Sequence, residues 1–369
     1  MTARLLRKLD ELIAANTGSI LADCASAKKA LHLVRVGRGD AAKEILEALH
    51  RKNDLKPDAR VSSWIHLVEG LMCLYLGVPG RPDDKLKRSL AIATAIGEPE
   101  IAALACAWSA HLAYGAYDID GLRNHLTRAL MLATAENHQA LARAKLIGAV
   151  ALHLANRLDL AQRWYSEVHT HAVEEGDDAT VSALMHNRSC MCVANMRQLA
   201  LDPFFSSSVH QASLGPSALL EATATASYDE LIGASSLSTW VPILRAQAYA
   251  LQGEYARALS LYEENIATAA EQGLDRVMGY MRADVAWCRL QAGRKDDVLE
   301  DARVAEASLE SEIVLVDDRA ATRCRLAAIY GALGLTEEAS RQSDIARSDW
   351  VEFRALQQEL VAAVGPLAR

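Results

Sequence analysis

A helical hairpin of about 40 residues recurs along this chain, and this repeat limits the possible folds more than any other feature of the sequence. Its clearest copy is AQAYALQGEYARALSLYEENIATAAEQG. Ala246 and Ala258 are small enough for two antiparallel helices to approach closely, and Gly253 permits the turn between them. Tyr249 and Tyr262 fill the remaining gaps. The unit is therefore predicted to be two packed helices joined by a short turn.

The packing position on the second helix aligns the copies with one another. It recurs at Ala42, Leu86, Leu122, Ala161, Ala258, Val298 and Ala339. Ala161 and Ala258 are too far apart for one repeat, and the stretch DPFFSSSVHQASLGP between them has no helical pattern. Setting that stretch aside supplies one more copy, with Ala218 in the packing position. The sequence therefore predicts a series of eight hairpins.

The length of the chain agrees with an elongated stack of hairpins. The chain has 369 residues, whereas a single compact core stops growing at roughly 250–300 residues. One hairpin cannot bury its apolar face alone, so stacked copies form a core that lengthens with each repeat. Hydrophobic residues make up 51% of the chain and only 8 residues are proline, which favours a folded helical protein over a disordered one.

The arrangement resembles tetratricopeptide repeats (TPR), in particular the long-helix variety of about 40 residues found in bacterial regulators. The resemblance covers nearly the whole chain. It implies an all-α fold, a right-handed α–α superhelix of about eight helical hairpins. The motif is degenerate, so it indicates the fold much more strongly than the task.

The repeat pattern divides the chain into five segments. Residues 1–20 are expected to form an N-terminal capping helix, and residues 21–200 to form hairpins one to four and the first helix of the fifth. Residues 201–216 form an inserted loop, and residues 217–347 hold the rest of the fifth hairpin and hairpins six to eight. Residues 348–369 are expected to be a C-terminal capping helix and tail. Either capping helix could instead pair with a second copy, which leaves a homodimer open.

Charge and cysteine content bear on partners and location. The chain has 39 Lys and Arg against 47 Asp and Glu, a net charge of −8, which disfavours nucleic acid as a partner. The seven cysteines lack the paired spacing of a disulfide framework. The longest uncharged stretch, from Ile101 to Tyr117, is close to the lower limit for crossing a bilayer and contains polar residues. We therefore expect a cytoplasmic protein without a membrane span.

Motifs that would indicate an enzyme or a metal site are weak in this sequence. Gly37 to Ala42 fits G-x-G-x-x-A, but Gly37 and Ala42 occupy the same repeat positions as the turn glycine and the packing alanine of the clearest copy. His186 and Cys190 lie one turn apart on a helix, but Cys192 points away from Cys190 and no further His or Cys pair lies at the spacing of a zinc finger, so packing is favoured over zinc binding. The sequence has no H-E-x-x-H, C-x-x-C or G-x-S-x-G. We predict no enzyme activity, no cofactor and no metal.

Acidic pairs such as Asp177-Asp178 and Asp317-Asp318 stand at or near the expected starts of helices. Negative charge at a helix N-terminus is favourable because the first N–H groups of a helix have no partner within it. Helix capping is therefore the simplest interpretation of these pairs.

The TPR resemblance implies that the first helix of each hairpin lines a concave groove. The residues expected to point into this groove and contact a partner are Trp64, Tyr75, Trp108, His111, Tyr114, Arg143, His153, His186, Asn187, Trp240 and Trp287. The resemblance also implies that an Asn in the position of Asn187 often hydrogen-bonds the backbone of an extended peptide. Alternatively, Asn187 bonds a neighbouring helix, since buried polar groups need partners in either case.

The lysines and asparagines that clamp an acidic peptide terminus in some TPR proteins are missing here, because Leu146 and Val150 precede Asn187 by one repeat. A ligand is therefore expected to insert apolar or aromatic groups, with Arg143, His186 and Asn187 fixing its polar groups. Phe204 and Phe205 form an apolar pair in the inserted loop, and docking within the chain is favoured over contact with a partner.

These observations favour a non-enzymatic scaffold or regulator that binds a protein or peptide in its groove. The alternative is a ligand-gated sensor of a small molecule or short peptide in bacterial signalling. The two hypotheses differ in whether a small ligand alone raises the stability of the protein.

Overall fold

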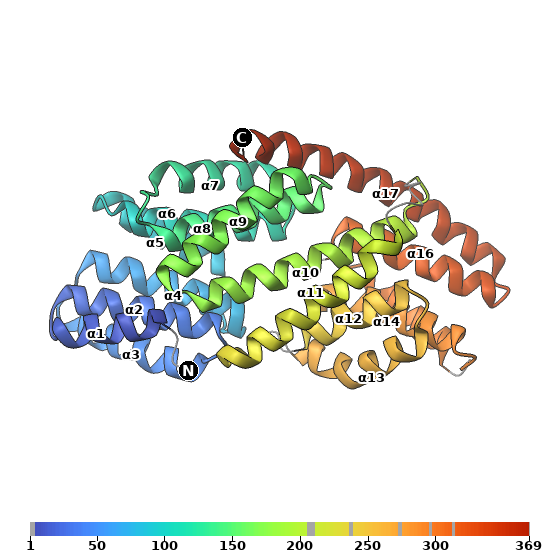
Figure 1. Cartoon of the computed structure of the whole chain (residues 1–369), viewed down its shortest axis with the longest axis horizontal. Coiled ribbons are helices and arrows are strands. Elements are labelled where there is room, and N and C mark those ends of the chain that lie inside the picture. The colour runs from blue at the N-terminus through green and yellow to red at the C-terminus, as the bar shows by residue number, and fades with distance from the viewer. Residues whose placement is uncertain are drawn as a thin grey trace.

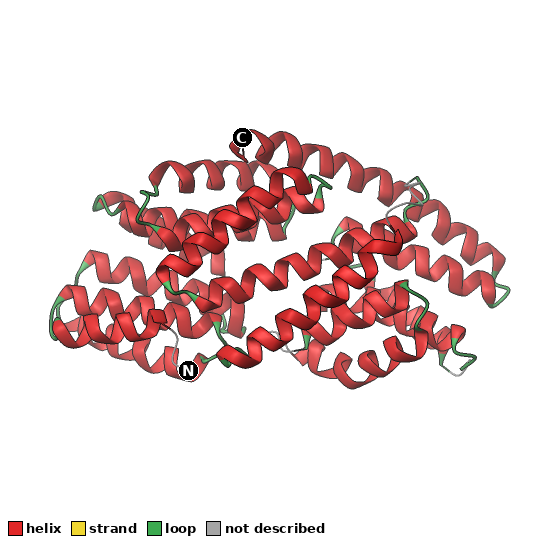
Figure 2. Cartoon of the chain, in the orientation of Figure 1, coloured by secondary structure: helices red, strands yellow, loops and turns green. Residues whose placement is uncertain are grey.

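The structure is a computed structural model that describes residues 4–204, 211–235, 239–271, 275–294, 297–311 and 314–368. Within these ranges the chain contains helices and no strand (Figure 2). The helix α1 (Arg4–Ala15) comes before the first hairpin. Among the described helices, none is both long and apolar enough to cross a membrane.

Sixteen further helices in the described part of the chain form successive pairs that pack side by side. The pairs are α2 (Ile20–Arg35) with α3 (Gly39–Leu55), α4 (Ala59–Leu76) with α5 (Pro82–Ala95), α6 (Pro99–Gly115) with α7 (Ile119–Leu132), α8 (His138–Leu154) with α9 (Leu158–Glu175), α10 (Asp178–Leu201) with α11 (Gln211–Ile232), α12 (Trp240–Leu251) with α13 (Tyr255–Glu271), α14 (Asp275–Gln291) with α15 (Val298–Ser308), and α16 (Val316–Ala332) with α17 (Thr336–Val364). The predicted all-α stack of helical hairpins is confirmed.

The turns and packing positions are those that the repeat predicts. Gly37 and Gly253 lie in turns with φ of 82° and 83°, a left-handed conformation that glycine adopts without steric cost. Asn156 takes the same role between α8 and α9 with φ of 57°. Ala42 and Ala258 are completely buried in their hairpins. Gly37 therefore serves a hairpin turn, as the sequence indicated, and not a nucleotide-binding loop.

The hairpins follow one another along the molecule, with α10 in the middle (Figure 1). The largest hydrophobic cluster extends through α2 to α9 and includes Trp350, Phe353 and Leu360 of α17. Smaller clusters fill the hairpins from α12 to α16. The core is therefore drawn out along the stack, as expected for a repeat protein.

The segment between α10 and α11 is shorter than expected. The sequence predicted a loop over residues 201–216, but α11 begins at Gln211. Serine, glycine and proline content suggested a loop there, whereas α11 already starts at Gln211 and packs against α10. The ring of Phe204 lies 4.2 Å from the guanidinium carbon of Arg354 on α17. This contact agrees with docking within the chain, whereas Phe205 lies outside the described residues.

The C-terminal helix joins the last hairpin to the middle of the molecule. We expected a separate capping helix from residue 348, but α17 is one continuous helix of 29 residues. It pairs with α16 and then reaches α7 and α8 (Figure 1). The short 3-10 helix η1 (Gly365–Ala368) contacts α9. At the other end, the amide of Leu5 on α1 donates to the carbonyl of Gly176, 3.1 Å away.

Candidate functional site

The first helices of the hairpins form a continuous surface, which we call the inner face. It consists of α2, α4, α6, α8, α10, α12, α14 and α16. The helix α10 is central to it, because it contacts α8 and α12 beside it and α16 across the stack. Polar side chains at both ends of α10 join it to other first helices, and two of these junctions contain buried charges.

The first junction connects the N-terminus of α10 to α2, and we call it the α2–α10 bridge. Arg35 donates from Nη1 to Oδ2 of Asp177 at 2.8 Å and from Nη2 to Oγ1 of Thr180 at 2.7 Å. The ring of His32 lies with Nδ1 3.3 Å from Oδ1 of Asp177. Asp177 also accepts a hydrogen bond from the backbone amide of Thr180, so it caps α10. The capping role was predicted from the sequence, and the ion pair was not.

Asp177 is 1% exposed. Burial alone would raise the pKa of its carboxyl, but the charge of Arg35 and the hydrogen bond with His32 outweigh burial. The pKa of Asp177 is therefore held well below its usual range. This carboxylate is a fixed negative charge on the inner face.

A second guanidinium lies near the same carboxylate. Arg143 on α8 is 5% exposed, and its guanidinium carbon lies 3.7 Å from the centre of the Trp108 ring. Burial lowers the pKa of Arg143 to about 10; Tyr75 and Asp177 oppose this change, and Arg35 reinforces it. Nη2 of Arg143 has no hydrogen-bond partner among the described residues. The carboxylate of Asp177 is thus bonded to Arg35, and its charge also acts on Arg143.

Four of the predicted site residues come together around this guanidinium. The edge of Tyr75 meets the Trp108 ring with centroids 5.9 Å apart, and the His111 ring lies 5.7 Å from the same indole. We call Tyr75, Trp108, His111 and Arg143 the Arg143 cluster. It joins α4, α6 and α8 on the inner face. A buried cation on an indole face with an unsatisfied N–H donor is suited to binding a carboxylate.

Other predicted residues bond within their own or the neighbouring hairpin. Nδ1 of His153 lies 3.1 Å from the Tyr165 hydroxyl, and burial together with the charge of Arg188 lowers the pKa of His153 to about 4. Nε2 of His186 lies 2.5 Å from Oδ2 of Asp229 on α11. These two histidines are held by the second helices of their hairpins, α9 and α11.

The remaining predicted residues are spread along the stack. Trp64 is buried beside Lys28, and Tyr114 donates to the sulfur of Met191. The side-chain amide of Asn187 donates to the carbonyl of Ala183 on its own helix, the indole N–H of Trp240 donates to Sγ of Cys190, and Trp287 lies beside Arg325. The structure does not gather these residues with the Arg143 cluster, and their predicted role in partner contact stays a prediction.

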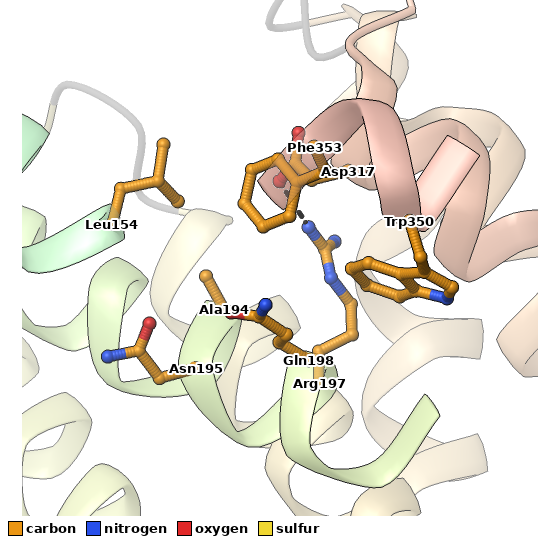
Figure 3. Close-up of a pocket in the computed structure, with 8 residues that line it drawn as sticks. All are labelled: Leu154, Ala194, Asn195, Arg197, Gln198, Asp317, Trp350 and Phe353. Carbon is orange, nitrogen blue, oxygen red and sulfur yellow. Dashed lines mark hydrogen bonds and ion pairs between the residues drawn. The ribbon is translucent and has the colours of Figure 1, made fainter. Parts of the chain in front are cut away.

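The second junction connects the C-terminal half of α10 to α16, and we call it the α10–α16 bridge. Arg197 donates to Asp318 at 2.6 Å and to Asp317 at 2.7 Å, and the Tyr117 hydroxyl donates to Asp317 at 2.9 Å. Figure 3 shows Arg197 reaching from α10 to Asp317 beside Trp350 and Phe353. Leu154, Ala194, Asn195 and Gln198 complete the lining of the small pocket there, which has no room for a water molecule. The sequence placed this acidic pair at a helix start but gave no partner for it.

A buried ion pair between α14 and α16 lies next along the inner face from the α10–α16 bridge. Arg325 donates from Nε to Oδ1 of Asp284 at 2.7 Å, and the Tyr262 hydroxyl donates to Oδ2 of the same carboxylate at 2.8 Å. Asp284 is fully buried. Here one guanidinium is paired with one carboxylate.

Comparison with known proteins gives one informative result. No known protein-family profile matches the chain, and no curated protein sequence matches it. Among solved structures, the chain is similar to the crystal structure of a Rap protein complexed with competence and sporulation factor. The similarity has a TM-score of 0.58 and covers 95% of this chain and 98% of that chain, at 13% sequence identity. The chain has a TPR-like helical-repeat fold. At this level of identity, the similarity shows the fold alone.

Proposed function

We propose that this protein is a non-enzymatic regulator of the long-helix bacterial TPR type, which works in the cytoplasm and binds a peptide or a segment of another protein on its inner face. Two observations support the proposal. The similar Rap protein is complexed with competence and sporulation factor, and the two chains share their fold over nearly their full lengths. The inner face of this chain also carries a buried, incompletely bonded cation on an aromatic platform.

The observation that carries the proposal is the charge balance around Asp177. Arg35 pairs with Asp177, and Arg143 on α8 is a second buried cation whose charge interacts with those of Arg35 and Asp177. An uncompensated buried charge is costly, and a carboxylate would offset it. We infer that Arg143 binds a carboxylate of the ligand, either the C-terminal group or an acidic side chain.

The other predicted residues extend this site along α6 and α10 to α14. Tyr114, Asn187, Trp240 and Trp287 are half-buried, so each retains surface for ligand contact. Trp64 and His153 are buried in their hairpins, and in this proposal they shape the inner face. Both bridges lie on this face, because α2 and α16 both meet α10 there.

A randomised peptide library with free C-termini tests the proposal. Peptides selected by the wild-type protein are measured by calorimetry against wild type and Arg143→Met, which keeps an apolar side chain on Trp108. Loss of a charge-assisted hydrogen bond of about 1.5–3 kcal/mol lowers affinity roughly 10- to 100-fold. Arg257→Met is the matched control, since Arg257 is an exposed residue of α13 paired with Glu254.

Amidated and free forms of the selected peptide locate the carboxylate. If Arg143 binds the terminal carboxylate, Arg143→Met weakens the free form and leaves the amide unchanged. Equal affinity of wild type and Arg143→Met for every selected peptide would refute the role of Arg143. Failure to select any peptide, together with a thermal shift by small carboxylates, would favour the alternative of a small-molecule sensor.

A further inference from the structure

A group of three potential metal ligands lies outside the inner-face residues described above, where α8 begins and α9 ends. Nδ1 of His138 is 3.2 Å from Nδ1 of His171 and 3.3 Å from Oε2 of Glu174. The three ligand atoms all lie within 4.8 Å of one another. The helices α8 and α9 form one hairpin, so the start of the first helix stands beside the end of the second.

The local sequence places two of the ligands on one helix surface. His171 and Glu174 are three residues apart on α9, and this spacing puts both side chains on the same face. Both lie in the last two turns of α9, where the helix dipole favours a cation. The side chain of Glu174 is 54% exposed and that of His138 is 20% exposed. The group is therefore open to ions in solution.

The polar contacts in this group cannot all be favourable at once. The ammonium of Lys145 lies 3.2 Å from Nε2 of His171 and can only donate, so Nε2 must accept and Nδ1 of His171 must carry the proton. His171 then donates to Nδ1 of His138, which is left with no proton for the carboxylate of Glu174. If His138 instead donates to Glu174, His171 must carry its proton on Nε2, facing the ammonium. The first arrangement places two hydrogen-bond acceptors in contact, Nδ1 of His138 and the carboxylate of Glu174. The second places two donors in contact, the Nε2–H of His171 and the ammonium of Lys145.

A cation resolves this conflict, because it accepts all three lone pairs together. A tetrahedral ion with bonds of about 2.0–2.1 Å holds its ligand atoms about 3.3 Å apart, as found for the two separations from Nδ1 of His138. His171 then carries its proton on Nε2, and Lys145 turns fully to Glu167, whose Oε2 is already 2.9 Å from Nζ.

We propose that His138, His171 and Glu174 bind one divalent cation of the zinc class, with water completing the coordination. Two imidazoles and one carboxylate suit Zn²⁺, Co²⁺ or Ni²⁺ better than Mg²⁺ or Ca²⁺, which prefer oxygen ligands. Three protein ligands leave a position for water. The cation links the two ends of the fourth hairpin, and this site is independent of peptide binding on the inner face.

The test uses the full-length, metal-stripped protein and two probes, Zn²⁺ in competition with a chromophoric chelator and Co²⁺ followed by its visible spectrum. One ion is expected per chain, with the ligand-field bands of four-coordinate Co²⁺ and no thiolate charge-transfer band. His171→Ala lowers Zn²⁺ affinity by at least about 100-fold, since even an indirect partner of a ligand is worth about 10- to 100-fold. His169→Ala is the matched control, an exposed histidine of the same helix, and leaves the affinity unchanged.

Two further variants sharpen the test. Glu174→Gln changes a largely exposed side chain, so it reports on binding even if His171→Ala unfolds the hairpin. Lys145→Met removes the positive charge beside His171 and raises the affinity for Zn²⁺. Equal binding by His171→Ala and His169→Ala, a cobalt spectrum dominated by thiolate bands, or an affinity lowered by Lys145→Met would overturn the proposal.

Discussion

The α2–α10 bridge gives the sharpest prediction on stability. Asp177→Asn keeps the size of the side chain and a good helix N-cap, so it removes the charge alone. Arg35 then loses the carboxylate with which it forms a buried ion pair. Breaking one side of a buried ion pair costs about 3–5 kcal/mol. We expect a decrease of that size in the free energy of unfolding, measured by urea denaturation with far-ultraviolet circular dichroism.

Two companion variants decide whether the charge is responsible. Arg35→Met combined with Asp177→Asn removes both partners and should recover a large part of the lost free energy. Asp178→Asn is the control, because Asp178 is half-buried and, among the described residues, its side chain accepts a single long hydrogen bond of 3.4 Å, from Tyr228. If Asp177→Asn costs no more than Asp178→Asn, the bridge is not a buried ion pair and the charge argument for the inner face fails.

The same residue predicts a dependence on pH. The pKa of Asp177 is depressed in the folded protein, whereas an unperturbed Asp titrates near about 3.9. The native state therefore binds fewer protons than the unfolded state in acid, and the stabilisation is complete above about pH 5 and lost as the pH falls toward the folded pKa. In Asp177→Asn this part of the acid destabilisation should be absent. If the free energy of unfolding falls in the same way with decreasing pH in wild type and Asp177→Asn, the depressed pKa of Asp177 is contradicted.

Three more predictions concern packing, thiol reactivity and the second bridge. Gly148→Ala should cost about 1–3 kcal/mol, since its new methyl group would overlap the ring of Trp164, and thermal unfolding measures the loss. Burial raises the pKa of Cys106 to about 11, so alkylation at pH 8 followed by mass spectrometry should spare this thiol until the protein unfolds. Tyr117→Phe removes the hydrogen bond to Asp317 and should cost about 1–3 kcal/mol in urea denaturation.

Each of these has a matched control. Gly115→Ala places a methyl group in open space and should not destabilise the protein by more than about 0.5 kcal/mol. Cys73 is half-buried and should be alkylated in the native state. Tyr255→Phe removes the hydroxyl of a half-buried residue that belongs to neither bridge, and it should change stability little. If a glycine or tyrosine variant and its control lose equal free energy of unfolding, the proposed contact is contradicted. If Cys106 and Cys73 are alkylated equally in the native protein, the burial of Cys106 is contradicted.

The hairpins could be predicted from the sequence because their signals are local. Small residues such as Ala42 and Ala258 and turn glycines such as Gly37 act within one repeat, so spacing alone reveals them. The continuous α17 was also visible in principle, since residues 336–364 contain no glycine or proline. We placed a boundary at residue 348 because the repeat length ended there. The start of α11 was missed because the Ser, Gly and Pro content upstream of Ser217 suggested a loop.

The candidate site was only partly predictable. The repeat rule gives the direction of Tyr75, Trp108, His111 and Arg143 along their helices, and the structure gathers these four. The rule says nothing about partners in distant repeats. Arg35 and Asp177 are 142 residues apart, so their contact depends on the curvature of the whole stack. For the same reason the metal ligands His138 and His171, on different helices, had no recognisable spacing.

The course of α17 determines how many repeats this architecture can hold. This helix starts in the eighth hairpin and ends against α7, α8 and, through η1, α9. Adding or deleting one hairpin between these points would displace its far end by the thickness of a repeat and break the contacts of Trp350, Phe353 and Leu360. An open solenoid can gain or lose modules freely during evolution. Here α17 fixes the distance between the eighth hairpin and α7 to α9. We therefore expect the number of repeats to be the same in proteins that retain α17.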